Sequence, residues 1–133
     1  MVVMGVWTAC FVDSKYSMTP EEVARLTSAY QEIGLDVNLQ DLHTEDEIIA
    51  ACGHTDVLLC NGNPPISRKV LKSLPDVKVV QRFGIGVNSV DLEAAAEYGV
   101  VVLNQPGISV QELSVHTTGL ILDLLRNITY YDR

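Results

Sequence analysis

The chain has 133 residues and a net charge of −8, from nine basic and seventeen acidic side chains. This length fits one domain with its own core, and the acidic balance argues against non-specific nucleic-acid binding, which needs a basic face. No apolar run approaches the roughly 20 residues that cross a bilayer, and the apolar start lacks the basic leader of a signal peptide. These features predict a cytoplasmic protein that binds neither nucleic acid nor membrane.

Strand and helix signals alternate along the chain. Thr19, Pro20, Glu21 and Glu22 have the composition of a helix start, with a capping hydroxyl, a first-turn proline and two acids. Strands are expected within 2–12 and over 36–39, 56–60, 77–80 and 100–103; helices are expected over 19–34, 44–53, 67–74, 91–99 and 110–130. We therefore predict an α/β fold: an open five-stranded parallel sheet with helices on both faces and flavodoxin-like strand order.

The three cysteines and three histidines show no pattern that indicates a metal or a nucleophile. Cys10, Cys52 and Cys60 are odd in number and have no C-x-x-C spacing. Cys10 and Cys60 lie in apolar strand runs, where a thiol usually acts as a small hydrophobic group. We expect buried reduced thiols, and no metal because no group of histidines, cysteines and acids has convincing ligand spacing.

The glycine-rich segment Gly84-Ile85-Gly86 is the main candidate for a ligand site. It follows a predicted strand, and parallel α/β folds place ligands at the carboxyl ends of their strands. It begins like the dinucleotide motif G-x-G-x-x-G, but Ser89 stands at the third glycine and no acid follows the next strand, so nucleotide binding is not favoured. Asp91 is expected to cap the next helix. Two interpretations stay open: the loop's backbone N–H groups hold a small carboxylate, or its glycines serve only a tight turn.

A set of segments, taken together, is more specific than any one of them. In chain order they are NGNPPI at 61–66, RFGIGVNSVD at 82–91, LEAAAEYG at 92–99, NQPG at 104–107 and ELSVHTTGLILDL at 112–124. They resemble the amino-terminal part of the D-isomer-specific 2-hydroxyacid dehydrogenases, the family that includes phosphoglycerate, glycerate and formate dehydrogenases. The resemblance covers most of the chain in the right order.

The resemblance implies a domain assignment and an activity. In this family a flavodoxin-like substrate domain is discontinuous in sequence, and the NAD-binding domain is inserted within it. Residues 1–133 would be the first substrate (catalytic) domain segment, with the NAD-binding domain absent from this chain. The intact enzyme would use NAD(H) or NADP(H) to transfer a hydride to or from a small 2-hydroxy or 2-oxo acid. The family's catalytic Arg, Glu and His lie further on, so we expect no catalytic residue here, no tight cofactor binding and no activity of this chain alone.

The resemblance also assigns roles to individual residues. The backbone amides of Gly84, Ile85 and Gly86 would bind the substrate carboxylate, and Ile85 would face the nicotinamide. Asn61 lies where some members have a polar or basic substrate contact. Ser109 falls near a position that touches the cofactor in some members.

Two departures from the family pattern affect the glycine loop and the last helix. Asn88 stands where the family usually has Asp, which mainly alters loop hydrogen bonding. Val115 replaces an acid before His116, which removes a charged pair. His116 lies among leucines at helical spacing, so we expect a packed, hydrogen-bonded side chain there rather than a catalytic one.

Two functions of a different class are alternatives to an enzymatic one. A phosphate-receiving signalling domain would need paired acids after the first strand, an Asp after the third and a Lys after the fifth. A lone Asp13, then Asn61 and Asn104, occupy those places and argue against it. The alternative that stays open is a standalone flavodoxin-like interaction module without catalysis. The apolar helix from Leu113 to Leu125 favours it, because an unpartnered apolar face tends to self-associate or bind a partner.

Overall fold

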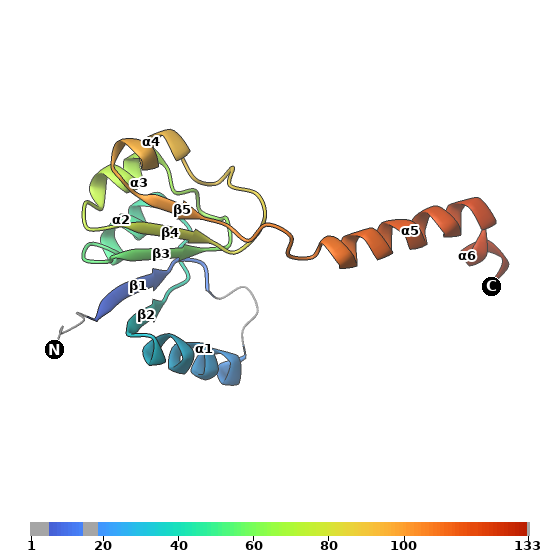
Figure 1. Cartoon of the computed structure of the whole chain (residues 1–133), viewed down its shortest axis with the longest axis horizontal. Helices are drawn as coiled ribbons and strands as arrows, with labels where there is room; N and C mark the ends of the chain where they lie inside the picture. The colour runs from blue at the N-terminus through green and yellow to red at the C-terminus, as the bar shows by residue number, and fades with distance from the viewer. Residues whose placement is uncertain (1–5, 15–18, 133) are drawn as a thin grey trace.

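The structure is a computed structural model that describes residues 6–14 and 19–132. Within these residues strands and helices alternate up to the last strand, as Figure 1 shows. The strands are β1 (Trp7–Phe11), β2 (Leu35–Leu39), β3 (Val57–Cys60), β4 (Val79–Arg82) and β5 (Val101–Leu103). The helices are α1 (Pro20–Glu32), α2 (Glu45–Ala51), α3 (Arg68–Ser73), α4 (Leu92–Glu97), α5 (Val110–Arg126) and α6 (Ile128–Tyr131).

The strands form one parallel sheet in the order β2-β1-β3-β4-β5, which confirms the predicted flavodoxin-like topology. In the β3–β4 pair Cys60 lies opposite Arg82, and in the β4–β5 pair Val80 lies opposite Val102. Because all strands run the same way, their carboxyl ends meet at one edge of the sheet. That edge positions every loop of the candidate site.

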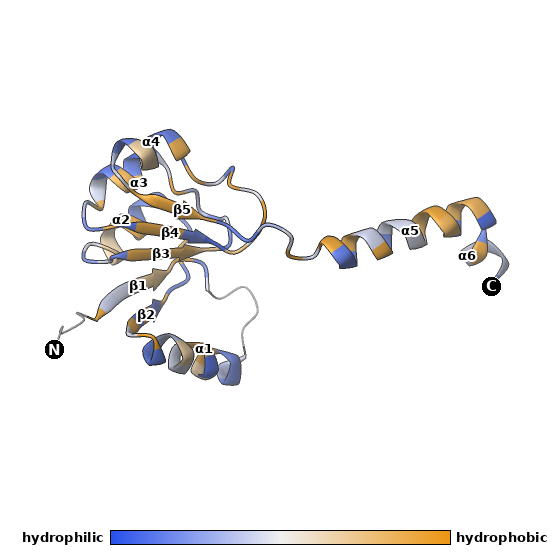
Figure 2. Ribbon diagram, viewed as in Figure 1, coloured by the Kyte–Doolittle hydropathy of each residue, from blue (hydrophilic) through white to orange (hydrophobic). Residues whose placement is uncertain are grey.

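Helices cover both faces of the sheet, as predicted, but unequally. The side chains of α2, α3 and α4 pack on one face in a large buried cluster that includes Ile48, Leu58, Val70 and Val80. On the other face α1 covers a smaller cluster around Phe11. Figure 2 shows that β3, β5 and the first part of β4 are strongly hydrophobic. Burial of this apolar surface is the main force that holds the sheet together.

Local signals place the ends of the first two helices. Thr19 caps α1 and Thr44 caps α2, each in a reciprocal pair with a glutamate three residues on. Such capping boxes satisfy backbone N–H groups that have no partner within the helix. Gly34 follows α1 with φ of +78°, a conformation that favours glycine and ends the helix.

The last helix differs from the prediction. Instead of one helix over 110–130, α5 ends at Arg126, and Asn127 adopts a left-handed conformation with φ of +51° before the short α6. Figure 1 shows α5 extending away from the sheet, and none of its residues is buried. On the face of the sheet that α1 covers only in part, Val101 and Leu103 of β5 are about half exposed. Among the described residues no helix is both long and apolar enough to cross a membrane.

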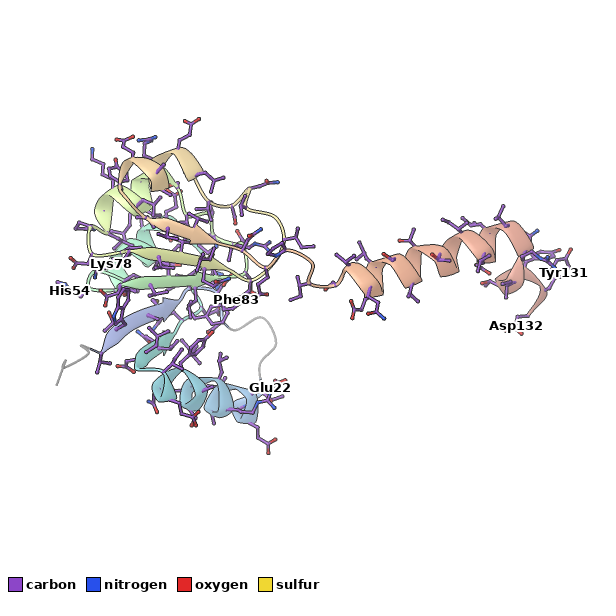
Figure 3. The ribbon with its side chains drawn as sticks, viewed as in Figure 1. Glu22, His54, Lys78, Phe83, Tyr131 and Asp132 are labelled. Carbon is purple, nitrogen blue, oxygen red and sulfur yellow. The ribbon has the colours of Figure 1, made fainter. Side chains whose placement is uncertain are left out.

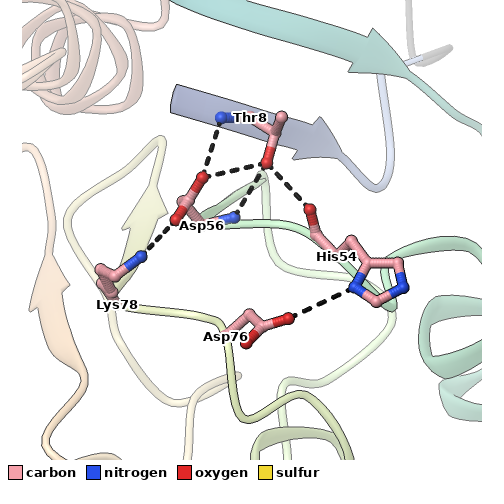
Figure 4. A network of polar contacts seen from close by, with 5 residues as sticks. All are labelled: Thr8, His54, Asp56, Asp76 and Lys78. Carbon is pink, nitrogen blue, oxygen red and sulfur yellow. Dashed lines mark hydrogen bonds and ion pairs between the residues drawn. The ribbon is translucent and has the colours of Figure 1, made fainter. Parts of the chain in front are cut away.

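A polar network joins the opposite, amino ends of the strands (Figure 4). The Asp56 carboxylate accepts hydrogen bonds from the backbone and hydroxyl of Thr8 on β1, at 3.0 and 3.1 Å, and from the Lys78 ammonium just before β4. These contacts, with Lys78 first, lower the pKa of Asp56 to about 2. The hydroxyl oxygen of Thr8 also lies 2.9 Å from the His54 carbonyl, so its one proton is shared between this carbonyl and the Asp56 carboxylate. The network ties three strands together far from the glycine loop, as the labels of His54, Lys78 and Phe83 show in Figure 3.

Candidate functional site

The candidate site lies where the carboxyl ends of β1, β3, β4 and β5 meet. The residues that follow these strands are Asp13, Asn61, Gly84 and Asn104 in the order of the strands. Segments up to 91 residues apart in the chain are thus brought to one edge by the parallel sheet. In folds of this class, that edge is where ligands bind.

Two carbonyl groups of the glycine loop accept hydrogen bonds from the segment after β5. The Gly84 carbonyl accepts the backbone N–H of Gln105 at 2.9 Å. The Ile85 carbonyl accepts the side-chain amide of Asn104 at 2.7 Å. Two of the three carbonyls of the loop, those of Gly84 and Ile85, are therefore paired with the segment after β5, whereas no donor of the described residues reaches the Gly86 carbonyl.

The N–H groups of the same loop are unpaired. Within the described chain, no acceptor is hydrogen-bonded to the backbone N–H of Ile85, Gly86 or Val87. Ile85 and Gly86 are also exposed. Consecutive free N–H groups are the donors that an anion-binding loop offers. The carboxylate interpretation of the loop stays a prediction.

Asp13 holds the neighbouring loop that follows β3. Its side chain is buried and accepts the backbone N–H groups of Asn61, Gly62 and Asn63, at 2.8, 3.1 and 3.4 Å. The amides of this loop are thus occupied by a carboxylate of the chain itself. Sequence reasoning noted Asp13 only as a lone acid and missed this role, because its partners lie 48 to 50 residues away.

Asn61, the predicted substrate contact, lies at this edge with an exposed side chain. Its amide nitrogen points back toward the Asp13 backbone carbonyl and carboxylate, at 3.4 Å each. These long contacts are weak. The substrate role of Asn61 stays a prediction.

Arg82, at the end of β4, lies between the two loops. A methyl group added at Gly84 would overlap its guanidinium, and one added at Gly62 would lie 3.1 Å from Nη2. Nη1 donates to the Phe83 carbonyl at 3.1 Å, while Nε is buried and has no hydrogen-bond partner in the described chain. The Ser89 hydroxyl, at the other end of the glycine loop, is likewise buried and unpaired among these residues.

The cysteines are all buried and unbridged, as predicted. Burial, with the Asp13 charge second, raises the pKa of the Cys60 thiol to about 12. A hydrogen bond with Cys52 and burial raise the pKa of Cys10 above its usual range. Since the thiolate is the reactive form, the thiols of Cys10 and Cys60 are structural rather than nucleophilic, whereas the hydrogen bond with Cys10 lowers the pKa of Cys52.

The structure does not bring Ser109, just before α5, or His116, on α5, to the site. Ser109 precedes α5 with φ of +64° and is exposed, and no hydrogen bond of the described residues joins it to the glycine loop. Its cofactor contact stays a prediction. His116 is exposed on α5, so its expected packed environment is wrong for this structure, because α5 does not pack against the sheet.

The residues at this edge do not fit a dinucleotide. Asp91 caps α4, as predicted, and accepts the Ala94 N–H at 2.8 Å. The Asp91 carboxylate therefore occupies the amino-terminal end of α4, and a Rossmann fold places the pyrophosphate at the corresponding end of its first helix. The helix starts eight residues after Gly84, and neither the third glycine nor the ribose-binding acid is present. The described chain offers no second dinucleotide motif.

The fold and this edge define an α/β domain with a loop suited to small anions. A family model described as D-isomer specific 2-hydroxyacid dehydrogenase, catalytic domain, matches residues 10–118. The chain therefore belongs to this family, which confirms the resemblance found in the sequence. The family consists of NAD-dependent enzymes, and the match is to their catalytic domain.

Relatives and solved structures agree with this assignment. The D-3-phosphoglycerate dehydrogenase of Methanocaldococcus jannaschii is 34% identical over 98 residues, which cover 74% of this chain and 18% of that protein. A hydroxypyruvate reductase of Thermotoga maritima is 30% identical over 94 residues, covering 71% and 30% of the two chains. This chain thus spans a fifth to a third of the length of these curated relatives.

Among solved structures, the PH0520 protein of Pyrococcus horikoshii superposes with a TM-score of 0.71 at 26% identity, over 97% of this chain and 36% of that one. An NAD+-bound 3-phosphoglycerate dehydrogenase of Entamoeba histolytica superposes with a TM-score of 0.72 over 90% of this chain and 39% of that one. At 18% identity the second likeness concerns the fold alone.

Proposed function

We propose that this chain is the substrate-domain portion, over residues 1–133, of an NAD-dependent D-2-hydroxyacid dehydrogenase. Its contribution is to bind a small 2-hydroxy or 2-oxo acid through the backbone amides of Gly84, Ile85 and Gly86. An NAD-binding domain outside these residues would supply NAD(H) or NADP(H), and Ile85 would face the nicotinamide. Asn61 and Ser109 are the further contacts proposed for substrate and cofactor.

One observation carries the binding proposal: three consecutive N–H groups of the glycine loop have no acceptor among the described residues, while the carbonyls of Gly84 and Ile85 are paired. A carboxylate placed against the loop could accept from the N–H groups of Ile85, Gly86 and Val87. Hydrogen bonds from neutral amides to a charged oxygen are stronger than neutral ones. Because the loop is already held by Gln105 and Asn104, binding would need little reordering of the backbone, which favours affinity.

The chain alone should not catalyse hydride transfer. The edge that it contributes holds no dinucleotide motif, and we assign no general acid to it. Robust oxidation of NADH by the purified 133-residue chain with hydroxypyruvate would contradict the proposal. The coding DNA after Arg133 offers an independent test, because a G-x-G-x-x-G motif within a few tens of codons would support a longer enzyme.

Nuclear magnetic resonance can test the binding role directly. Sodium D-glycerate, a small 2-hydroxy acid, is titrated into the 15N-labelled chain, with neutral D-glyceramide as the matched control. We expect D-glycerate to shift the amide resonances of Ile85, Gly86 and Val87 more than those of Asn61, Gly62 and Asn63, whose donors Asp13 occupies. Equal shifts with the neutral amide would show that the carboxylate is not recognised.

Exposed apolar side chains on α5 favour a second candidate, a non-catalytic module that associates with another copy of itself. Leu113, Leu124 and Leu125 are 69–77% exposed, and the helix contacts no strand. Size-exclusion chromatography with light scattering decides. A dimer that becomes a monomer in Leu124→Glu, but not in Gln111→Glu, would support this candidate, and a monomeric unaltered chain would contradict it.

A further inference from the structure

We propose that Arg82 is a specificity-determining residue of the acid-binding edge, whose guanidinium supplies the positive charge that selects an anionic carboxylate over neutral ligands. This inference rests on the proposed function of the glycine loop and adds the Arg82 side chain to the backbone N–H groups proposed to bind the acid there. It concerns the chemistry of recognition and not the hydride transfer.

The first argument is the position of the guanidinium. It fills the space beside the α-carbon of Gly84, the residue just before the run of free N–H groups. It also lies beside Gly62 on the neighbouring loop, whose notional methyl group would be 3.1 Å from Nη2. The two glycines leave room for a charged group between the loops, where a side chain at either position would crowd it.

The second argument is the missing counter-charge. Among the described residues, no carboxylate oxygen lies within 4.0 Å of Arg82. Asp13, the acid of the adjoining loop, already accepts three backbone N–H groups. A guanidinium is always charged and carries five donors. One of these is paired with the Phe83 carbonyl, and Nε is buried without a partner.

The third argument is that the unpaired groups form one cluster of donors. The buried Ser89 hydroxyl lies 3.7 Å from the notional methyl of Gly62, on the same side as Arg82 Nη2. Leaving buried donors unpaired is unfavourable. An anion between the loops would satisfy them together with the backbone N–H groups of Ile85 and Gly86. A purely structural arginine would be expected to pair its buried Nε within the fold.

The test is a titration of the 133-residue chain and its variants with sodium D-glycerate, followed by NMR of the backbone amides and of the Arg82 Nε–H resonance. We expect D-glycerate, but not neutral D-glyceramide, to shift the Arg82 side-chain resonance. We expect Arg82→Met to raise the dissociation constant at least tenfold, and Arg82→Lys, which keeps the charge but not the planar fork, to raise it less. Arg126→Met, an equal charge change at the end of α5, should leave the dissociation constant unchanged.

The outcomes separate this inference from the proposed function. If Arg82→Met keeps the amide shifts of the glycine loop and a dissociation constant within twofold of the unaltered chain, Arg82 does not recognise the acid, while the loop still does. If the unaltered chain shows no response at Ile85, Gly86 and Val87, both proposals are wrong. Thermal unfolding of each variant shows whether it still folds. If Arg82→Met does not fold, Arg82→Lys provides the test. A dissociation constant of Arg82→Lys within twofold of the unaltered chain, with no shift of the lysine ammonium resonance, would overturn the inference.

Discussion

Replacing Asp13 with asparagine tests how the loop after β3 is held at the edge of the sheet. The buried carboxylate accepts N–H groups from Asn61, Gly62 and Asn63, at 2.8, 3.1 and 3.4 Å. Asparagine has nearly the same shape, but it offers one accepting oxygen and turns an NH2 group toward these donors. A hydrogen bond to a charged group is worth roughly 1.5–3 kcal/mol, against about 1 for a neutral one. Since one of the three contacts is long, we expect Asp13→Asn to cost about 2–3 kcal/mol of unfolding free energy.

Urea unfolding of the 133-residue chain, followed by circular dichroism, measures this loss. The matched control is Asp36→Asn, because Asp36 is exposed on β2 and should change stability by less than about 0.5 kcal/mol. If both variants lose the same small amount, below about 1 kcal/mol, the contacts from the carboxylate to the loop do not stabilise the fold. The account of Asp13 as the holder of this loop would then be refuted.

Three other predictions use the same unfolding assay. Since the hydrogen bond from Lys78 lowers the pKa of Asp56 to about 2, the stability from this carboxylate is fully present above about pH 4 and is lost as the pH falls through about 2. Asp56→Asn should therefore cost about 1 kcal/mol at pH 7, after allowance for solvent screening, and nothing below pH 2; a loss independent of pH would contradict this. Gly84→Ala should cost about 1–2 kcal/mol, because φ of +156° is unfavourable for a residue with a side chain and because its methyl group overlaps the Arg82 guanidinium; the overlap part should be absent when Arg82→Ala is also present; additive losses would rule out the overlap. Thr44→Ala should cost about 1 kcal/mol by removing the cap of α2, and an unchanged midpoint would show that the cap is dispensable.

The order of strands and helices could be predicted because its signals are local. The capping residues Thr19 and Thr44 each lie within four residues of the groups they serve. The path of the last helix could not be predicted in the same way. An apolar helical pattern over 110–130 predicts a helix, but whether that helix is buried depends on a surface elsewhere. The break at Asn127 is also unexpected, because a single asparagine in a left-handed conformation is only a preference.

The glycine loop was found from sequence because glycine spacing after a strand is visible without coordinates. Its partners were not. Asp13 could have been found only by combining two inferences: that β1 lies beside β3, and that an acid ending one strand can reach the loop that ends the other. Arg82 carries no local signal, because an arginine at a strand end is usually solvated. Its unpaired Nε becomes apparent only when the surrounding acceptors are placed in space.

Two neighbouring loops at this edge both present consecutive backbone N–H groups, but these groups are paired in only one of the loops among the described residues. In the loop after β3, consecutive N–H groups converge on the Asp13 carboxylate, which shows that backbone donors here can bind an acid group. In the loop after β4, three consecutive N–H groups have no acceptor among the described residues, and no carboxylate oxygen of these residues lies within 4.0 Å of Arg82. The N–H groups of the first loop are satisfied within the chain, whereas we propose that a carboxylate from outside satisfies those of the second. The difference between the loops, more than the glycines themselves, is why we assign the acid to Gly84-Ile85-Gly86.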